Sequence, residues 1–478
     1  MNNSKYDFAI LGAGPGGYVA AIRAAQLGAK VALIEKENLG GVCLNKGCIP
    51  TKAIISSLNI FEKIKKAETF GIDINGTSSP NLKKIIERKN KIVSNSIKGI
   101  ESLLKSHKID LFKGQGKLVS KNNLIIVEGQ DTRYEIRDTK HIIIATGSTP
   151  KIIPECPIDG KHIISSDEAL NETTIPEHIL IIGAGIIGCE LAFIYKSLGA
   201  EVSLVEALPT ALNTLDEDAI KIIEKEFIKK KINLYTNTKL RNTFPDGNKI
   251  KAILDSGQEL IADKILISVG RKLNTENIGL EKIKINIEPT GQIIVNEYLE
   301  TNVPNIYAIG DVIGNAIGGK MLAHKASYDG ILVVENIINE TKIKADYSYL
   351  PSVIFTQPEI GSFGLTEKEA KENNFIYKTG NFPFRASGKA IVMSETNGFV
   401  KIIVLKNNNK IIGATIVGPG ATELIHELAL TAQNNLPIES IINTIHGHPT
   451  LSESIKESAE DVFGKAIHTV RAYRVEDR

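Results

Sequence analysis

The chain has 478 residues, of which 42% are hydrophobic and 23% are charged, and its formal net charge is +2. This length predicts about two to four domains, and the near-neutral charge excludes a general attraction to nucleic acid or to a membrane surface. No apolar run is long enough to span a bilayer. Residues 1–7 lead straight into a predicted strand without the regions of a signal peptide, so a cytoplasmic protein is expected.

A glycine-rich loop near the start of the chain carries the first motif. Residues 6–11 predict a buried strand, the loop Gly12-Ala13-Gly14-Pro15-Gly16-Gly17 follows, and residues 20–27 predict a helix. A second strand, residues 31–34, ends at Glu35. This order of elements indicates a dinucleotide-binding unit, in which the helix N-terminus attracts pyrophosphate and the acid holds ribose hydroxyls. Gly12 permits the tight turn, and Gly14 lets the backbone approach the pyrophosphate. Gly17 lets the helix pack closely on the strand.

Two of the four cysteines lie just downstream of that loop, with four residues between them. A flavin or nicotinamide moves two electrons and a disulfide takes two electrons to open, so Cys43 and Cys48 are candidates for a redox pair. Two other interpretations are buried thiols that never meet and half of a zinc site. Zinc usually requires a closer spacing and two further ligands, whereas Cys156 and Cys189 stand alone, so no metal is expected. Lys46 lies between the pair, where it either stabilises a thiolate or is a solvated surface lysine.

The dinucleotide unit occurs a second time in the chain. Residues 179–182 predict a strand, the loop 183–188 follows, and a further strand, residues 202–205, ends at an acid. Each key residue stands 171 positions after its counterpart, as 183 minus 12 and 206 minus 35 both give. One such glycine loop is a weak signal, but two complete copies predict two bound dinucleotides; the second copy contains Gly183, Gly185, Gly188 and Glu206. The carboxylate of Glu206 suits a free 2′-hydroxyl and repels a 2′-phosphate, so this unit should prefer NAD to NADP.

Taken together and in order, these motifs resemble those of the flavin-dependent disulfide oxidoreductases, the pyridine nucleotide-disulfide oxidoreductase family. The likeness covers nearly the whole chain and is closest to the members that oxidise dihydrolipoamide. Its motifs are the two glycine loops, the second continuing to Glu190, the cysteine segment 40–52, and the segments 145–147, 269–271, 308–311, 321–326 and 446–453.

The resemblance implies an α/β fold with two Rossmann-like dinucleotide-binding domains and a C-terminal α/β dimerisation domain. An FAD domain would span residues 1–150, an NAD domain 151–277, a return to the FAD domain 278–347, and the interface domain of a homodimer 348–478. Within the last part, the sequence itself predicts strands at 399–405 and 411–417 and a helix at 422–434.

The resemblance also implies the catalytic roles. Cys43 would exchange with the substrate, and Cys48 would lie against the flavin. A thiol must become a thiolate to attack a disulfide, and an imidazole titrates in the right range to take that proton. The family supplies this base from the partner subunit, here His448, with Glu453 orienting it and His446 in support. Taken alone, a histidine before a proline is more often a turn residue.

The remaining family motifs are expected to hold the two cofactors. Lys52 and Glu190 would form a buried pair beneath the flavin, the other interpretation being two unrelated surface charges. Gly270 would close over NAD. The rest of the FAD site, along its ribityl chain and pyrimidine edge, would be formed by Gly116, Thr146, Gly147, Asp311, Met321, Leu322, Ala323 and His324.

The expected activity is oxidation of dihydrolipoamide to lipoamide with reduction of NAD⁺. The substrate would arrive on a lipoyl-bearing protein of a 2-oxo acid dehydrogenase complex or of a glycine cleavage system, because this chain shows no lipoyl-bearing segment. A glutathione-type reductase using NADPH conflicts with Glu206. A mercuric reductase would carry a further C-terminal cysteine pair, a transhydrogenase would not need Cys43 and Cys48, and a non-catalytic scaffold would need neither these cysteines nor His448.

Two positions depart from the common family pattern. Gln357 stands where many members have His or Glu before Pro-Glu. The stretch 382–390, with residues 387–389 near its end, differs from the common form, which has Asn-Ser-Arg there. Neither touches a predicted redox group, so these departures concern dimer contacts or docking to a larger complex.

Overall fold

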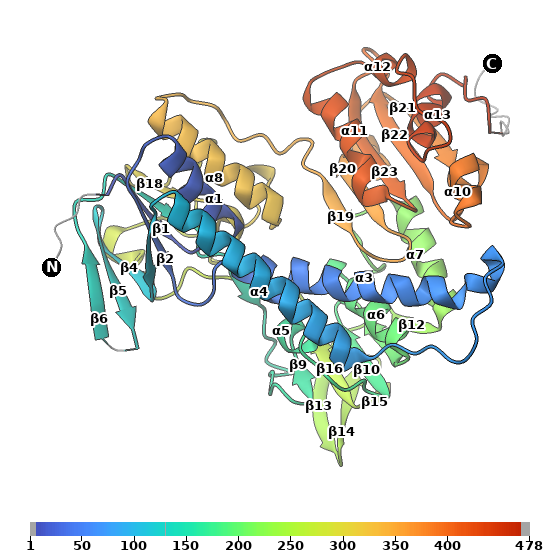
Figure 1. Cartoon of the computed structure of the whole chain (residues 1–478), viewed down its shortest axis with the longest axis horizontal. Coiled ribbons are helices and arrows are strands. Elements are labelled where there is room, and N and C mark those ends of the chain that lie inside the picture. The colour runs from blue at the N-terminus through green and yellow to red at the C-terminus, as the bar shows by residue number, and fades with distance from the viewer. Residues whose placement is uncertain (1–5, 130, 470–478) are drawn as a thin grey trace. The chain divides into compact units, whose positions relative to one another are not determined.

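The computed structural model describes residues 6–129 and 131–469. Two compact units can be distinguished, each built from two separate stretches of chain. The first unit contains Met1–Ile175 and Leu266–Tyr347, and the second contains Pro176–Ile265 and Ser348–Arg478. Figure 1 shows the elements of both units along the chain.

A five-stranded parallel sheet forms the centre of the first unit. Its order is β18-β7-β1-β2-β3, and β1 occupies the middle. Parallel strands covered on both faces are expected to be continuous apolar runs, and every residue of β1 is buried. The strands are β1 (Phe8–Leu11), β2 (Val31–Glu35), β3 (Asp110–Lys113), β7 (His141–Ile144) and β18 (Ile306–Ala308).

Two helices of the first unit cross each other through small residues. Helix α1 (Pro15–Gln26) starts with proline at its first position, where the missing N–H is not needed. It packs against α8 (Ala323–Ile338) so closely that a Cβ on Gly330 would lie 2.6 Å from the Gly16 carbonyl oxygen. The Ser327 hydroxyl also donates to the Pro15 carbonyl at 3.4 Å. The chain returning at residues 323–338 is therefore fixed against the helix that follows the first glycine loop.

The other elements of the first unit surround this core. An antiparallel sheet contains β4 (Gln115–Ser120), β5 (Asn123–Glu128) and β6 (Asp131–Ile136), and a second pairs β8 (Ser148–Pro150) with β17 (Arg271–Leu273). The helices are α2 (Gly41–Lys46), α3 (Cys48–Lys65), α4 (Leu82–Ser106) and α5 (Ser166–Ala169); β9 covers Ile163–Ile164, and short 3₁₀ turns are η1 (Ala67–Phe70), η2 (Glu281–Ile283), η3 (Gly310–Ile313) and η4 (Ala316–Gly318).

The second unit begins with a parallel arrangement like that of the first. Strand β10 (His178–Ile182) pairs with β11 (Glu201–Val205), which pairs with β12 (Ile232–Tyr235). Helix α6 (Ile186–Leu198) joins β10 to β11, and α7 (Glu217–Lys230) precedes β12. An antiparallel sheet of β13 (Leu240–Asp246), β14 (Lys249–Leu254) and β15 (Glu259–Ala262) follows, and then β16 (Lys264–Ile267).

The C-terminal part of the second unit is an antiparallel sheet with helices. Its strand order is β19-β20-β23-β22-β21. Helix α11 packs on this sheet, since a Cβ on Gly361 of β20 would lie 2.9 Å from the Ile425 side chain. The strands are β19 (Ser352–Ile354), β20 (Ile360–Gly364), β21 (Tyr377–Pro383), β22 (Phe399–Leu405) and β23 (Ile411–Val417); the helices are α9 (Glu367–Glu372), η5 (Phe384–Ala386), α10 (Gly388–Val392), α11 (Ala421–Gln433), α12 (Glu439–Ile442) and α13 (Glu453–Asp461).

The predicted α/β fold is confirmed, and most predicted elements fall within two residues of the observed bounds. The strands predicted at 399–405 and 411–417 are β22 and β23, and the helix predicted at 422–434 is α11. The first strand begins at Phe8 rather than residue 6. Within the described residues, no helix is long and apolar enough to cross a membrane.

A buried lysine joins separate segments of the second unit. Lys401 of β22 is 5% exposed and lies 3.1 Å from Asp216, 2.9 Å from Asp218 and 2.5 Å from Glu367. Burial alone would lower the pKa of Lys401, but hydrogen bonds to Glu367 and Asp218 raise it well above its ordinary value. The pKa of Asp218 is lowered, because contact with Lys401 outweighs the effect of burial. Lys401 therefore stays charged and ties the N-terminus of α7 to the C-terminal sheet.

Replacing Lys401 by Met should destabilise the protein by about 3–5 kcal/mol, because buried Asp216 then loses its cation. The depressed pKa of Asp218 contributes stability above the unfolded-state value of about 4. The difference from wild type should thus persist at neutral pH and shrink as the pH falls below that value. Denaturant unfolding at several pH values measures it. Lys406→Met, at an exposed position just after β22, should change stability by less than about 0.5 kcal/mol; equal losses for both variants would contradict the assignment.

Candidate functional site

The first glycine loop is closed by the acid that the sequence placed at the end of β2. The Glu35 carboxylate accepts hydrogen bonds from the Ala13 and Glu37 backbone N–H groups, both at 2.7 Å. Gly12 has a φ of 99°, and a Cβ on Gly17 would collide with the Gly12 carbonyl oxygen. Gly12 thus makes the tight turn and Gly17 lets α1 pack directly on the loop, as a dinucleotide-binding unit requires.

The second loop repeats this arrangement atom for atom. The Glu206 carboxylate accepts from the N–H groups of Ala184 at 2.7 Å and Leu208 at 3.0 Å, the counterparts of Ala13 and Glu37. Gly183 has a φ of 100°, and a Cβ on Gly188 would collide with the Gly183 carbonyl oxygen. Gly185 is the N-cap of α6, as Gly14 is of α1. The internal repeat seen in the sequence is therefore a repeat of loop structure and hydrogen bonding.

The cysteine segment is built directly onto the first loop. The Gly40 N–H donates to the Ala13 carbonyl at 2.8 Å, and Gly41 has a φ of 58° with its Cα packed on Gly14, where a Cβ would lie 2.6 Å from the Gly14 Cα. Helix α2 begins at this contact, and α3 begins at Cys48, after Gly47. Two glycines thus bring the cysteines as close to the dinucleotide loop as two backbones can come.

The thiols of Cys43 and Cys48 lie within hydrogen-bonding distance of each other. Cys43 is partly buried and Cys48 is exposed. A hydrogen bond with the Cys48 thiol, together with burial, raises the pKa of Cys43 well above its ordinary value, while the charge of Lys52 acts in the opposite direction. This is the arrangement that a reduced disulfide would have. The other two cysteines are buried, and burial also raises the pKa of Cys189.

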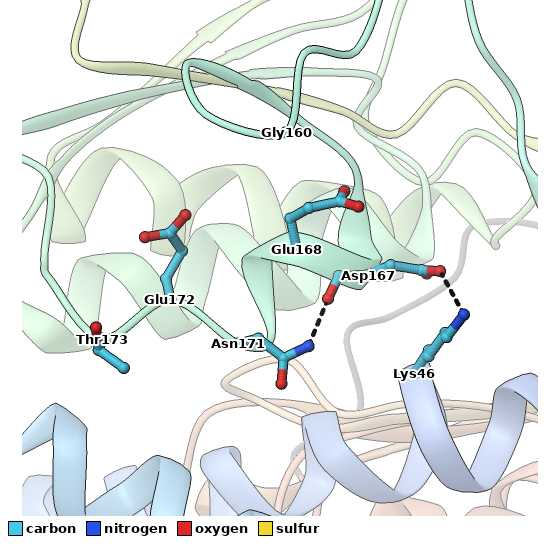
Figure 2. A pocket seen from close by; sticks show the side chains of 7 residues that line it. All are labelled: Lys46, Gly160, Asp167, Glu168, Asn171, Glu172 and Thr173. Atoms are coloured by element: carbon cyan, nitrogen blue, oxygen red, sulfur yellow. Dashed lines mark hydrogen bonds and ion pairs between the residues drawn. The ribbon is translucent and has the colours of Figure 1, made fainter. Parts of the chain in front are cut away.

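Lys46 is a partly exposed lysine, 39% of its side chain being accessible, and its partners are carboxylates. Its ammonium lies 2.8 Å from Glu37 and 3.9 Å from Asp167, at the edge of a pocket that Glu168 and Glu172 also line. Figure 2 shows the Lys46 side chain directed at Asp167 of α5. The hydrogen bond from Lys46 lowers the pKa of Glu37, more than burial raises it. Lys46 therefore links the cysteine helix α2 to the loop after Glu35, and the cation that acts on Cys43 is Lys52.

The predicted flavin-binding segments of the first unit are held by hydrogen bonds that the sequence did not reveal. The Thr146 hydroxyl donates to the Asn274 carbonyl at 2.7 Å, and the Asn274 N–H donates to the Gly147 carbonyl at 3.0 Å. The Asp311 carboxylate accepts from the Ser148 hydroxyl at 2.5 Å. Arg271 in turn donates from Nε to the Ser148 Oγ at 2.6 Å. Ser148 directly follows the Ala-Thr-Gly motif, which is the only sequence signal that could have drawn attention to it.

The other predicted cofactor residues of the first unit lie in a strand, before a strand and at the start of a helix. Gly116 lies in β4, where a Cβ would come within 3.2 Å of the Leu11 side chain. Gly270 has a φ of 113° just before β17. The segment Met321-Leu322-Ala323-His324 contains the N-cap Leu322 and the first residues of α8.

The candidate general base, His448, and its carboxylate partner, Glu453, both lie in the second unit. The His448 Nδ1 lies 2.9 Å from the Glu453 carboxylate, which also accepts from the Thr450 N–H at 2.8 Å. Burial raises the pKa of Glu453, but the hydrogen bonds from Thr450 and His448 together lower it further, so that the pKa lies below its ordinary value and Glu453 stays ionised. The His448 ring is 77% exposed. His446 forms a similar pair with Glu427 at 2.8 Å, but its ring is only 6% exposed.

Glu190 lies in α6 and is 3% exposed. Its carboxylate accepts from the Phe355 N–H at 2.9 Å. The pairing of Glu190 with Lys52 would join the two units, and the approach of His448 to the cysteines would join two subunits. Both stay predictions.

The residues of both glycine loops fit a dinucleotide, because each loop packs so tightly on its helix that a Cβ would collide, and each is followed by a strand with a carboxylate at its end. The family comparison agrees: the family model for pyridine nucleotide-disulphide oxidoreductases matches residues 6–330, and the model for the dimerisation domain of these proteins matches residues 350–459. The chain belongs to the pyridine nucleotide-disulphide oxidoreductases. The predicted cofactors FAD and NAD are confirmed by this membership, as is the presence of a dimerisation domain.

Similar proteins extend over the full length of the chain. A dihydrolipoyl dehydrogenase of Chlamydia trachomatis is 41% identical over 468 residues, covering 98% of both chains. One from Bacillus subtilis is 41% identical over 97% of this chain and 99% of its own. Among solved structures, LpdA from Mycobacterium tuberculosis has a TM-score of 0.89 at 25% identity, and the match covers 96% of this chain and 99% of the LpdA chain. The HOCl-induced flavoprotein disulfide reductase RclA from Escherichia coli has a TM-score of 0.86 at 26% identity, and the match covers 97% of this chain and 100% of the RclA chain.

A glycine-to-alanine replacement in one loop at a time should distinguish the FAD site from the NAD site. Gly17→Ala is expected to prevent FAD retention, because its Cβ collides with the Gly12 carbonyl. Gly188→Ala should leave FAD bound and weaken NAD binding at least about tenfold, which corresponds to about 1.4 kcal/mol, because its Cβ collides with the Gly183 carbonyl oxygen and displaces the loop. Flavin absorbance of the purified protein and NAD titration measure the two effects. Gly99→Ala in α4, where a Cβ meets nothing within 4 Å, is the control, and flavin loss in that variant would contradict the steric explanation.

Proposed function

We propose that the protein oxidises dihydrolipoamide to lipoamide and reduces NAD⁺ to NADH, using Cys43 and Cys48 as a redox disulfide. The observation that carries the proposal is the pair of touching thiols on helices seated against the first glycine loop. The full-length similarity to dihydrolipoyl dehydrogenases selects the dithiol substrate. The carboxylate of Glu206 favours NAD over NADP as the acceptor.

In the oxidised protein, the first step is attack on the Cys43–Cys48 disulfide by one thiolate of the substrate. His448 of the partner subunit takes the proton from that thiol, and Glu453 of the same chain stabilises the resulting imidazolium. The bond to the Cys43 sulfur forms as the disulfide breaks, and Cys48 leaves as a thiolate. The second substrate thiol then displaces Cys43, which releases lipoamide and leaves both cysteines reduced.

The two glycine loops divide the binding of the nucleotides between the units. Gly12, Gly14, Gly17 and Glu35 would hold the pyrophosphate and ribose of FAD, and Gly183, Gly185, Gly188 and Glu206 those of NAD. When bound, FAD would supply a two-electron carrier between the dithiol and NAD⁺, and Cys48 would be the cysteine next to it. Lys52 would lie near its reactive edge with Glu190 as counter-charge, and Thr146, Asp311 and the segment 321–324 would complete the site.

The domain boundaries belong to the same proposal: FAD-binding residues 1–150 and 278–347, NAD-binding residues 151–277 and interface residues 348–478. The division between the compact units at Tyr347 supports the last boundary. We further propose a cytoplasmic homodimer that shares each active site between subunits and receives its substrate on a lipoyl-bearing protein of a 2-oxo acid dehydrogenase complex or a glycine cleavage system.

Cys48→Ser should abolish NADH formation from dihydrolipoamide while FAD stays bound, because one sulfur alone cannot store two electrons as a disulfide. The coupled NADH assay and the flavin spectrum check both parts. Cys156→Ala, at a buried cysteine outside the pair, should keep its activity. Full turnover by Cys48→Ser would exclude the redox disulfide.

His448→Gln should slow dithiol oxidation by about 10²- to 10⁴-fold, the usual contribution of a positioned base. The remaining rate should rise with pH, since substrate thiols then ionise without help. Stopped-flow measurement of dithiol oxidation over a pH series tests this. His426→Gln, on the exposed side of α11, should match wild type; an unchanged rate in His448→Gln would remove it as the base.

A direct comparison of substrates tests the proposal as a whole. Turnover of dihydrolipoamide with NAD⁺ should greatly exceed turnover of glutathione disulfide with NADPH. The reverse order would assign the protein to the glutathione-type reductases.

A further inference from the structure

Helix α8 carries an ion pair with no exposure to solvent. Lys325 and Asp329 stand one helical turn apart, their charged groups are 2.8 Å apart, and both side chains are 0% exposed. Burying two charges is unfavourable unless the remaining donors and acceptors also find partners. The neighbours of this pair therefore indicate what the pair holds in place.

The shared neighbour of both charges is the peptide of Gly310. Asp329 Oδ2 accepts from the Gly310 N–H at 3.0 Å, and the Lys325 ammonium donates to the Gly310 carbonyl at 3.4 Å. Asp329 Oδ1 accepts from the Tyr347 hydroxyl at 2.7 Å. Burial and the nearby Asp329 carboxylate raise the pKa of Tyr347, so its hydroxyl stays protonated and donates. Lys325 also lies 5.1 Å from the centre of the Tyr347 ring.

Gly310 is held in a backbone conformation that an ordinary residue rarely adopts. Its φ is 73°, and a Cβ there would approach the Ala326 side chain to 3.1 Å. Gly310 begins the turn η3, and the next residue is Asp311, whose carboxylate is fixed by Ser148 on its other side. The orientation of Gly310 therefore decides where the Asp311 carboxylate points.

The same pair also connects two segments of the proposed flavin site. Lys325 and Asp329 lie on the first turns of α8, immediately after Met321 and Leu322. The segment 321–324 of the proposed FAD site thus lies at the start of α8, and Asp311 of the same site lies in the turn η3, which α8 holds through Lys325 and Asp329.

We propose that Lys325, Asp329 and Tyr347 are positioning residues for FAD, which fix the Gly310–Asp311 turn so that the Asp311 carboxylate is placed before the cofactor arrives. This inference rests on the FAD site of the proposed function. None of the three side chains acts on the substrate. Their contribution is to the affinity for FAD, because a turn held in advance loses less entropy on binding.

Replacing the hydroxyl of Tyr347 gives the mildest test. In Tyr347→Phe the apoprotein should fold, and the dissociation constant for FAD should rise about tenfold, since a hydrogen bond to a charged acceptor is lost. Tyr6→Phe is a matched control, because the Tyr6 hydroxyl donates to Asp110 over the same 2.7 Å in the same unit. Titration of apoprotein with FAD, followed by flavin fluorescence, gives both constants, and thermal unfolding of the apoproteins gives their stabilities. Equal FAD affinity in Tyr347→Phe and Tyr6→Phe would overturn the proposal.

A double replacement separates positioning from simple stabilisation. Lys325→Met with Asp329→Leu exchanges the pair for apolar side chains of similar size, a change that often leaves stability unaltered or higher. A purely structural pair predicts unchanged FAD binding, whereas the proposal predicts FAD binding weakened about 100-fold in a stable apoprotein with an altered flavin spectrum. Lys272→Met with Glu276→Leu removes an exposed pair of the same spacing in the same unit and should leave FAD binding unchanged.

The outcomes distinguish this inference from the proposed function. Tight FAD binding by wild type and by the double variant alike would overturn the positioning role and leave the redox assignment standing. Failure of wild type to bind FAD would overturn both. These titrations use no dihydrolipoamide, so the choice of substrate does not affect them.

Discussion

The contact between two backbones, at Gly14 and Gly41, is the constraint on which the chemistry of the first unit depends. Because neither residue has a Cβ, helix α2 starts against the dinucleotide loop, and the Gly40 N–H bonds to the Ala13 carbonyl. Cys43 then lies in α2, and Cys48 is the first residue of α3. Electron exchange requires close approach, and this contact provides it through main chain rather than through flexible side chains.

Both nucleotide loops are stabilised in the same way, by a carboxylate that accepts two backbone N–H groups. Glu35 and Glu206 each use both carboxylate oxygens to hold two backbone N–H groups of their own loop. The fixed spacing of 171 residues reflects one structural solution used in both units.

Buried charges hold the segments that the chain order separates. Lys401 joins α7 to the C-terminal sheet, and Lys325 with Asp329 joins α8 to the turn before Asp311. Hydrophobic burial has no direction and leaves such contacts free to slide, whereas a hydrogen-bonded charge fixes one arrangement, because leaving it unpaired in the interior is very unfavourable. Exposed pairs such as that of Lys46 with Glu37 contribute less, because solvent screens them.

The sequence by itself determined the α/β class, both glycine loops with their acids and the neighbouring cysteines, since each depends on residues close together in the chain or on an apolar period. The pairing of His448 with Glu453 was indicated by the family resemblance of its motif. The roles of Ser148, Asn274, Tyr347 and Lys46 were decided only by the tertiary structure. Their partners lie far along the chain or across an element, as Tyr347 does from Asp329. A local pattern carries no record of such contacts, because they form only when packing brings distant segments together.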